Sequence, residues 1–179
     1  PLDALLVVDM QCGLLAGPPK HDLEGVVGRI NALAAAIRAC GGAIVWIRHC
    51  GPAGDAFEAG RPGWAFLPAL AVQPDDHVVE KRLNDAFAGT GLQQRLQALS
   101  ADRLVVAGWA TDFCVNSTVR SAVSNGWRVA VAADAHTLGD RPMLDAPTAI
   151  AYHNWMWGGL IAAQPVAVQT TQELLGEAV

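Results

Sequence analysis

The sequence of 179 residues lacks the features that would direct it to a membrane or a nucleic acid. No apolar run reaches the roughly 20 residues of a membrane-spanning helix, and the opening residues lack the charge pattern of a signal peptide. Lys and Arg total 12 against 17 Asp and Glu, and no basic cluster is present. This balance argues against a nucleic-acid partner. We therefore expect a cytoplasmic protein without a membrane or nucleic-acid partner.

Two common motifs are also missing. The four cysteines stand at positions 12, 40, 50 and 114 without a Cys-x-x-Cys pair, so free thiols in a reducing compartment are expected. No Gly-x-Gly-x-x-Gly follows the first apolar run, which removes the main signal for a dinucleotide site. These absences argue against a cysteine-based metal site and against a dinucleotide-binding protein.

Apolar residues, in contrast, are abundant: they make up 52% of the chain, and charged residues only 16%. A chain of this length and composition predicts one domain, residues 1–179, with a core on both sides of a sheet. Periodicity predicts strands over 4–9, 43–48, 77–81, 103–107, 128–132 and 165–168, and helices over 22–40, 91–99, 112–125, 144–156 and 171–176. This alternation predicts an α/β fold, a Rossmann-like three-layer αβα sandwich with a mostly parallel six-stranded sheet.

Cys114 has the most informative surroundings of any residue in the chain. An apolar run over 104–107 ends at Gly108, Thr111 or Asp112 offers a helix cap, and apolar residues then recur at helical spacing. Cys114 is therefore expected in the first turn of a helix that follows a strand. The positive end of a helix dipole favours a thiolate there. The alternative is that Cys114 is only a small buried apolar residue.

Two further strand ends strengthen the nucleophile interpretation. The apolar run over 4–8 leads directly into Asp9, and the run over 77–80 ends near Lys81. Ligands of open parallel sheets bind outside the carboxyl ends of the strands. Asp9, Lys81 and Cys114 would therefore meet at one edge as an acid/base group, a cation and a nucleophile. Taken singly, Asp9 could be a helix cap and Lys81 a solvated charge.

Four segments together resemble the isochorismatase-like cysteine hydrolases, the superfamily that includes nicotinamidase and N-carbamoylsarcosine amidohydrolase. The segments are 6–11, 79–92, 106–115 and 126–135, and the most specific stretch among them reads Gly-Trp-Ala-Thr-Asp-Phe-Cys-Val. The resemblance implies the sandwich fold already predicted and a catalytic triad of Asp9, Lys81 and Cys114. It also implies oxyanion donors at Ala110 and Cys114, with a cis peptide between Trp109 and Ala110.

The substrate pocket is predicted from the same resemblance and from residue type. Leu14 and Phe113 match pocket positions of the family, while Trp64 and Trp109 offer flat faces for a planar amide. His49 could contact the substrate or pack beneath the loop over 51–68.

Nicotinamidases bind a metal through an Asp-x-His pair and a second His. The equivalent segment here, 44–50, reads Ile-Val-Trp-Ile-Arg-His-Cys and has no such pair. A single His does not make a divalent site. We therefore expect no metal and no other cofactor, which argues against nicotinamide as the substrate.

The sequence thus predicts a cysteine-dependent hydrolase that cleaves a small amide, ureido or carbamoyl substrate through a thioester. One alternative is vinyl-ether hydrolysis of the isochorismatase type, although a cysteine nucleophile is not typical of that reaction. The other is an interaction protein that retains the fold with a relic site.

The late aromatic segment 155–157, together with the resemblance, predicts a homodimer or higher homo-oligomer, because one helix cannot turn all three side chains inward. His21, His77 and His136 have no partner pattern in the sequence and are expected on the surface.

Overall fold

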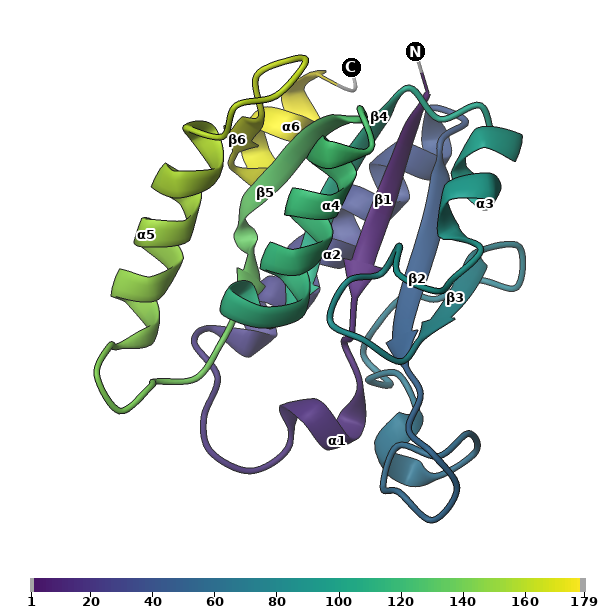
Figure 1. Cartoon of the computed structure of the whole chain (residues 1–179), viewed down its shortest axis with the longest axis vertical. Helices are drawn as coiled ribbons and strands as arrows, with labels where there is room; N and C mark the ends of the chain where they lie inside the picture. Colours follow the sequence, from purple (N-terminus) through teal and green to yellow (C-terminus); the bar gives the residue numbers. More distant parts are fainter. Residues whose placement is uncertain (1, 178–179) are drawn as a thin grey trace.

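A single sheet of six parallel strands runs through the structure, a computed structural model that describes residues 2–177 (Figure 1). The strand order is β3-β2-β1-β4-β5-β6, and every neighbouring pair is parallel. The strands are β1 (Asp3–Val8), β2 (Ala43–His49), β3 (His77–Lys81), β4 (Arg103–Trp109), β5 (Arg128–Thr137) and β6 (Ala167–Gln169). The predicted α/β sandwich is confirmed, with a sheet that is parallel throughout the described residues.

Helices cover both faces of this sheet, as a parallel sheet requires (Figure 1). α2 (Leu23–Ala39) and α6 (Thr171–Glu177) pack on one face, and α3 (Leu92–Ala98), α4 (Asn116–Ser124) and α5 (Ala146–Gly158) pack on the other. Alternate residues of β1 point to opposite faces, so Leu5 and Val7 join one core cluster, and Leu6 and Val8 join the other. None of the described helices is long and apolar enough to cross a membrane.

Two short elements near the carboxyl ends of the strands were not predicted: α1 (Cys12–Leu15) and the 3₁₀ turn η1 (Pro62–Trp64). The helix predicted over 112–125 begins as the π-helical turn η2 (Thr111–Val115), which leads into α4. The predicted cap at Thr111 or Asp112 is wrong, because α4 begins after Val115 and has no side-chain cap. The Thr111 hydroxyl instead contacts His136, and Asp112 pairs with Arg141.

Gly108 allows β4 to approach β1 closely at the end of the sheet. Its φ is +122°, in the region that favours glycine, and a Cβ at this position would collide with the backbone of Val8. The pairing between β4 and β5 also shifts register between Val106 and Gly108. The end of β4 therefore lies directly beside the end of β1, and the segment after β4, which carries Cys114, lies next to Asp9.

Candidate active site

Asp9 follows β1, in the backbone position where the chain leaves the sheet. Its φ of 51° lies in the left-handed region, which Asp adopts more readily than most residues. The side chain is fully buried. Apart from the ion pair with Lys81, neither carboxylate oxygen has a hydrogen-bond partner among the described residues. The carboxylate is therefore available to exchange a proton with the thiol.

Lys81 ends β3 and reaches across β2 to meet Asp9. Its ammonium nitrogen lies 2.7 Å from Asp9 Oδ2, 3.4 Å from Cys114 Sγ and 2.9 Å from the backbone carbonyl oxygen of Leu83. The Lys81 side chain is 0% exposed. A buried ammonium group needs such partners, so Lys81 is a fixed cation between the carboxylate and the thiol, and the solvated-charge alternative does not hold.

Cys114 lies in η2, and its Sγ faces both members of that pair. The thiol donates toward Asn84 Oδ1 at 3.6 Å and lies close enough to the Asp9 carboxylate for its charge to raise the thiol pKa. The preceding Trp109–Ala110 peptide is cis, as the resemblance implied. Three distant parts of the chain thus bring a carboxylate, an ammonium group and a thiol together at the carboxyl edge of the sheet.

The surroundings of Cys114 in the folded chain oppose the thiolate that the helix start predicts. Burial, with the adjacent Asp9 charge, raises the pKa of Cys114 to about 12, although Lys81 opposes the shift. Burial also raises the pKa of Asp9. Since the carboxyl group is the stronger acid and lies closer to Lys81, the single negative charge stays on Asp9. The resting site therefore pairs a carboxylate with a neutral thiol.

We expect the alkylation of Cys114 by iodoacetamide to accelerate steadily as the pH rises from 7 to 10. Only the thiolate reacts, and a pKa near 12 keeps the thiolate fraction small and growing about tenfold per pH unit over that range. Residue-resolved mass spectrometry measures the rate, with the exposed Cys40 as an internal control for the reagent. A rate that is already constant below pH 7 would instead indicate a thiolate at rest.

A cavity of about 320 Å³ opens onto the thiol. Its walls contain apolar and aromatic groups, with polar groups at a few points, as small-molecule sites usually do. They are formed by Asp9, Leu14, His49, Asn84, Trp109, Ala110, Phe113, Cys114 and Arg141. All predicted site residues except Trp64 therefore lie at this cavity or, as Lys81 does, directly behind it.

Trp64 is not part of the cavity wall. Its ring packs against the guanidinium group of Arg48, 3.3 Å from the ring centroid, and its carbonyl oxygen accepts a hydrogen bond from Gln11. Arg48 also pairs with Glu80 at 3.0 Å. Trp64 thus fixes the loop over 51–68 to the sheet, and its contact with a substrate stays a prediction.

Sequence reasoning assigned no role to three residues of the site. Asn84 and Arg141 line the cavity, and the buried side chain of Gln11 bonds the backbone N–H and C=O groups of His49 at 2.8 and 2.9 Å. Gln11 and Asn84 lie within the segments 6–11 and 79–92 that carry the family resemblance. The resemblance could therefore have drawn attention to both residues, but it did not indicate their contacts. Arg141 follows β5 in a loop without a motif and had no signal.

His136 contradicts its predicted surface position. The side chain is buried, and its ring nitrogens lie 2.8 Å from Thr111 Oγ1 and 2.9 Å from Asn154 Oδ1. The partners come from residues 25 before and 18 after it in the chain. No local pattern could therefore reveal them.

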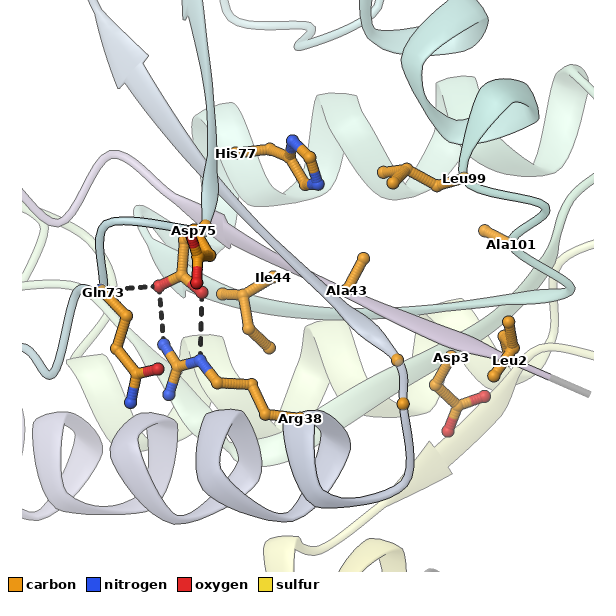
Figure 2. A pocket seen from close by; sticks show the side chains of 13 residues that line it. Leu2, Asp3, Arg38, Ala43, Ile44, Gln73, Asp75, His77, Leu99 and Ala101 are labelled. Atoms are coloured by element: carbon orange, nitrogen blue, oxygen red, sulfur yellow. Dashed lines mark hydrogen bonds and ion pairs between the residues drawn. The ribbon is translucent and has the colours of Figure 1, made fainter.

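A second cavity, of about 350 Å³, lies at the opposite edge of the sheet, where β1, β2 and β3 begin. Figure 2 shows Arg38 extending toward the segment that carries Gln73 and Asp75, and its guanidinium group pairs with Asp76 at 2.6 Å. Asp76 also accepts a hydrogen bond from Trp46 Nε1 at 2.8 Å. Asp76 is therefore the polar partner of both Arg38 and Trp46 at this second cavity. The candidate active site is accordingly the first cavity, which opens onto Cys114.

No group of three or more His, Cys, Asp or Glu side chains within residues 2–177 is arranged to hold a metal ion. His49 lies at the cavity, and its ring packs edge-on to Phe57 at a centroid distance of 5.6 Å. Independence from metal stays a prediction that requires an activity measurement.

Fold and site define an α/β protein with a thiol, a carboxylate and an ammonium group gathered at the carboxyl edge of a parallel sheet. The chain belongs to the isochorismatase family of hydrolases, since the model of the isochorismatase domain matches residues 3–164.

Curated relatives of this chain include hydrolases of amide bonds. A streptothricin hydrolase from Streptomyces noursei is 35% identical over 142 residues, covering 79% of this chain and 51% of that protein. A maleamate amidohydrolase from Pseudomonas putida is 30% identical over 158 residues, covering 77% and 72%. The chain thus spans only about half the length of the streptothricin hydrolases that it matches.

Solved structures of other proteins have the same fold as this chain. A cysteine hydrolase from Pseudomonas syringae superposes with a TM-score of 0.85 at 25% identity, covering 99% of this chain and 93% of that one. An N-carbamoylsarcosine amidase from Thermoplasma acidophilum gives a TM-score of 0.77 at 23% identity, covering 96% and 97%, and bears on the fold alone.

Proposed function

We propose that this chain is a cysteine-dependent amidohydrolase that cleaves a small amide, ureido or carbamoyl compound through a thioester intermediate. The observation that carries the proposal is the buried contact of Asp9, Lys81 and Cys114 at the floor of one cavity. Relatives named as amidohydrolases give independent support.

The first half of the reaction forms the thioester. Asp9 takes the thiol proton as Cys114 Sγ attacks the carbonyl carbon, and the carbonyl oxygen becomes an oxyanion. The backbone N–H groups of Ala110 and Cys114 are the proposed donors to that oxyanion. Asp9 then gives its proton to the leaving nitrogen, the C–N bond breaks, and ammonia or an amine departs.

The second half returns the enzyme to its resting state. Asp9, again a carboxylate, takes a proton from water, and the resulting hydroxide attacks the thioester carbonyl carbon. The C–S bond breaks, the acid product leaves, and Asp9 returns the proton to the Cys114 sulfur. Lys81 stays charged throughout and balances the one negative charge that moves between carboxylate and sulfur.

Cavity size and lining favour small planar substrates. A volume of about 320 Å³ lies at the lower end of the range for small-molecule sites. Trp109 and Phe113 supply aromatic surface, while Asn84 and Arg141 supply polar groups near the thiol. These features suit a compact acyl group with a polar substituent.

A panel of primary amides, ureido acids and carbamoyl compounds, assayed for release of ammonia, tests the function. We expect steady turnover of at least one class, and a vinyl ether in the same panel tests the isochorismatase-type alternative. If no amide is hydrolysed but the vinyl ether is, vinyl-ether hydrolysis would replace the proposed amidohydrolase activity. Failure of the whole panel, with no acyl-enzyme detected by intact mass, would favour the relic interpretation.

Activity on the best amide is expected to survive prolonged chelation unchanged. Arg48 and His49 stand where metal-binding relatives have an Asp-x-His pair, and the proposed steps need only protein groups. The measurement compares kcat/KM before and after dialysis against a chelator, with metal content checked by elemental analysis. Activity lost on chelation and restored by zinc, manganese or iron would contradict the prediction.

Self-association is a further expectation, and it rests on α5. Trp157 is fully buried in this helix, whereas Trp155 is 75% exposed and the neighbouring Tyr152 is 52% exposed. Large exposed aromatics close together are typical of protein interfaces. Light scattering at micromolar concentration should give at least twice the 18.8 kDa chain mass, with Trp155→Glu shifting the population toward monomer. A monomer mass for the unaltered chain would contradict the expectation.

A further inference from the structure

His136 lies behind the proposed active site and takes no part in the steps above. It stands on β5 opposite Gly108 of β4, and its side chain is only 1% exposed. Two polar partners engage its ring: Thr111 Oγ1 at Nδ1, 2.8 Å away, and Asn154 Oδ1 at Nε2, 2.9 Å away. A buried imidazole that is hydrogen-bonded at both nitrogens has a defined orientation. The donor or acceptor role of each partner shows which ring nitrogen carries the hydrogen.

The hydrogen bonds of Asn154 fix the tautomer of His136. Asn154 Nδ2 donates to the carbonyl oxygen of Ala133 at 2.9 Å, so its Oδ1 is the atom that faces the ring. That oxygen only accepts, and Nε2 must therefore carry the hydrogen. In the neutral ring Nδ1 is then an acceptor, and the Thr111 hydroxyl donates to it.

The surroundings keep this ring neutral. Burial lowers the pKa of His136 to about 4, and the charge of His153 on α5 acts in the same direction. Asn154 and the carboxylate of Asp134 on the same strand oppose the shift. Trp157 packs edge-on against the ring at a centroid distance of 5.1 Å. On η2, the Asp112 carboxylate is already paired with Arg141 at 2.8 Å.

Thr111 connects this network to the reacting groups. It directly follows Ala110 and begins η2, the turn that carries Cys114. The Ala110 carbonyl oxygen accepts hydrogen bonds from the N–H groups of Phe113 and Val115, both at 3.1 Å. A fixed Thr111 therefore constrains the short segment that holds both the proposed oxyanion donors and the nucleophile.

We propose that His136 is a positioning residue for the reaction, acting through the Thr111 hydroxyl to hold the turn from Ala110 to Cys114. The proposal rests on the proposed function for its catalytic part, while the hold on the turn can be tested separately. Displacing a reacting group by about 1 Å can lower a rate about 10²-fold. Loss of the Thr111 contact should therefore lower kcat far more than it changes KM.

Two substitutions of similar size separate the two hydrogen bonds. His136→Asn places an amide oxygen near the position of Nδ1 and can still accept from Thr111. His136→Gln places its amide near the position of Nε2 and can still donate to Asn154, but it leaves Thr111 without its acceptor. Thr111→Val removes the hydroxyl while conserving side-chain shape, and it gives an independent variant should His136→Gln fail to fold.

The first readout is hydrogen–deuterium exchange of the peptide over 110–118, referenced to the peptide over 23–39 in α2. We expect exchange over 110–118 to accelerate at least about tenfold in His136→Gln and Thr111→Val and to stay within about threefold of the unaltered protein in His136→Asn. The reference peptide removes differences in global stability. If the peptide over 110–118 exchanges equally fast in His136→Asn and His136→Gln, the proposal that His136 holds the turn is wrong.

The second readout is kcat on the best amide of the panel. We expect a loss of about 10²-fold in His136→Gln and Thr111→Val with KM changed less than about threefold, and no further loss when the two are combined. Faster exchange with unchanged kcat would overturn the catalytic part. If the unaltered protein hydrolyses no amide, the proposed function fails, and exchange alone decides whether His136 holds the turn.

Discussion

Replacement of Cys114 by Ala is expected to abolish turnover of the best amide, by about 10⁴-fold or more, while the protein remains folded. The change removes the sulfur that attacks the carbonyl carbon, and no other described side chain in the cavity wall can form a thioester. Little packing is lost, because the side chain is small and only partly buried. Ammonia release measures the turnover, and circular dichroism with urea unfolding measures the fold.

Cys40→Ala is the matched control, since it makes the same chemical change at an exposed site at the end of α2. It should keep the unaltered kcat and remove only the alkylation at that position. Intact mass after rapid acid quench should show an acyl adduct in the unaltered protein and none in Cys114→Ala. Hydrolysis of the amide by Cys114→Ala at the unaltered rate would show that another group is the nucleophile.

The central strands β1, β2 and β4 were predictable because each contains a continuous apolar run, as expected for strands buried on both faces. Predicted and observed bounds differ by at most two residues for β1 to β4, and those of β3 agree. The exception is β5, which extends to Thr137, because polar residues such as Asp134 and His136 interrupt its apolar pattern. Both residues are satisfied by distant partners: Asp134 accepts from the N–H and hydroxyl groups of Thr171, and His136 binds Thr111 and Asn154.

The positions of Asp9, Lys81 and Cys114 were predictable for a related reason. Each stands at or beyond the carboxyl end of a strand, and a parallel sheet brings those ends to one edge. Their charge state was not predictable from local structure. The helix start suggested a lowered thiol pKa, whereas burial and the Asp9 carboxylate, both products of tertiary packing, raise it.

Cavity residues without a motif were the least predictable. Arg141 reaches the site from the loop after β5 and is held there by two hydrogen bonds to Asp112, both 2.8 Å. Trp64 was expected at the substrate because of residue type, yet its ring stacks on Arg48. The position of each side chain is set by one partner that is distant in the sequence, Asp112 for Arg141 and Arg48 for Trp64. Only the folded structure identifies these partners.

Lys81→Met is expected to lower kcat/KM by about 10³-fold and to make stability strongly dependent on pH. Met keeps most of the apolar stem but removes the cation 2.7 Å from Asp9. Without Lys81, burial alone raises the pKa of Asp9 further, so the carboxyl group holds its proton at neutral pH and cannot act as the base. Alkylation of Cys114 at a fixed pH should slow as well, because Lys81 favours the thiolate.

The sign of the stability effect follows from proton linkage. In Lys81→Met the folded protein keeps the Asp9 proton to a higher pH than the unfolded chain does, so the carboxyl group favours folding at low pH and loses that contribution as the pH rises. Urea unfolding should therefore show a small deficit near pH 5 that grows toward pH 8, up to the roughly 3–5 kcal/mol of a broken buried ion pair.

Asp9→Asn in the Lys81→Met background is the matched control, because it removes the buried acid and leaves two neutral side chains of similar volume. The double variant should recover most of the stability lost at pH 8 and none of the activity, since the base is absent in both. If Lys81 and Asp9 act through their charges, stability should return in the double variant while activity does not. A deficit independent of pH, or one that persists in the double variant, would mean that Lys81 contributes mainly by packing.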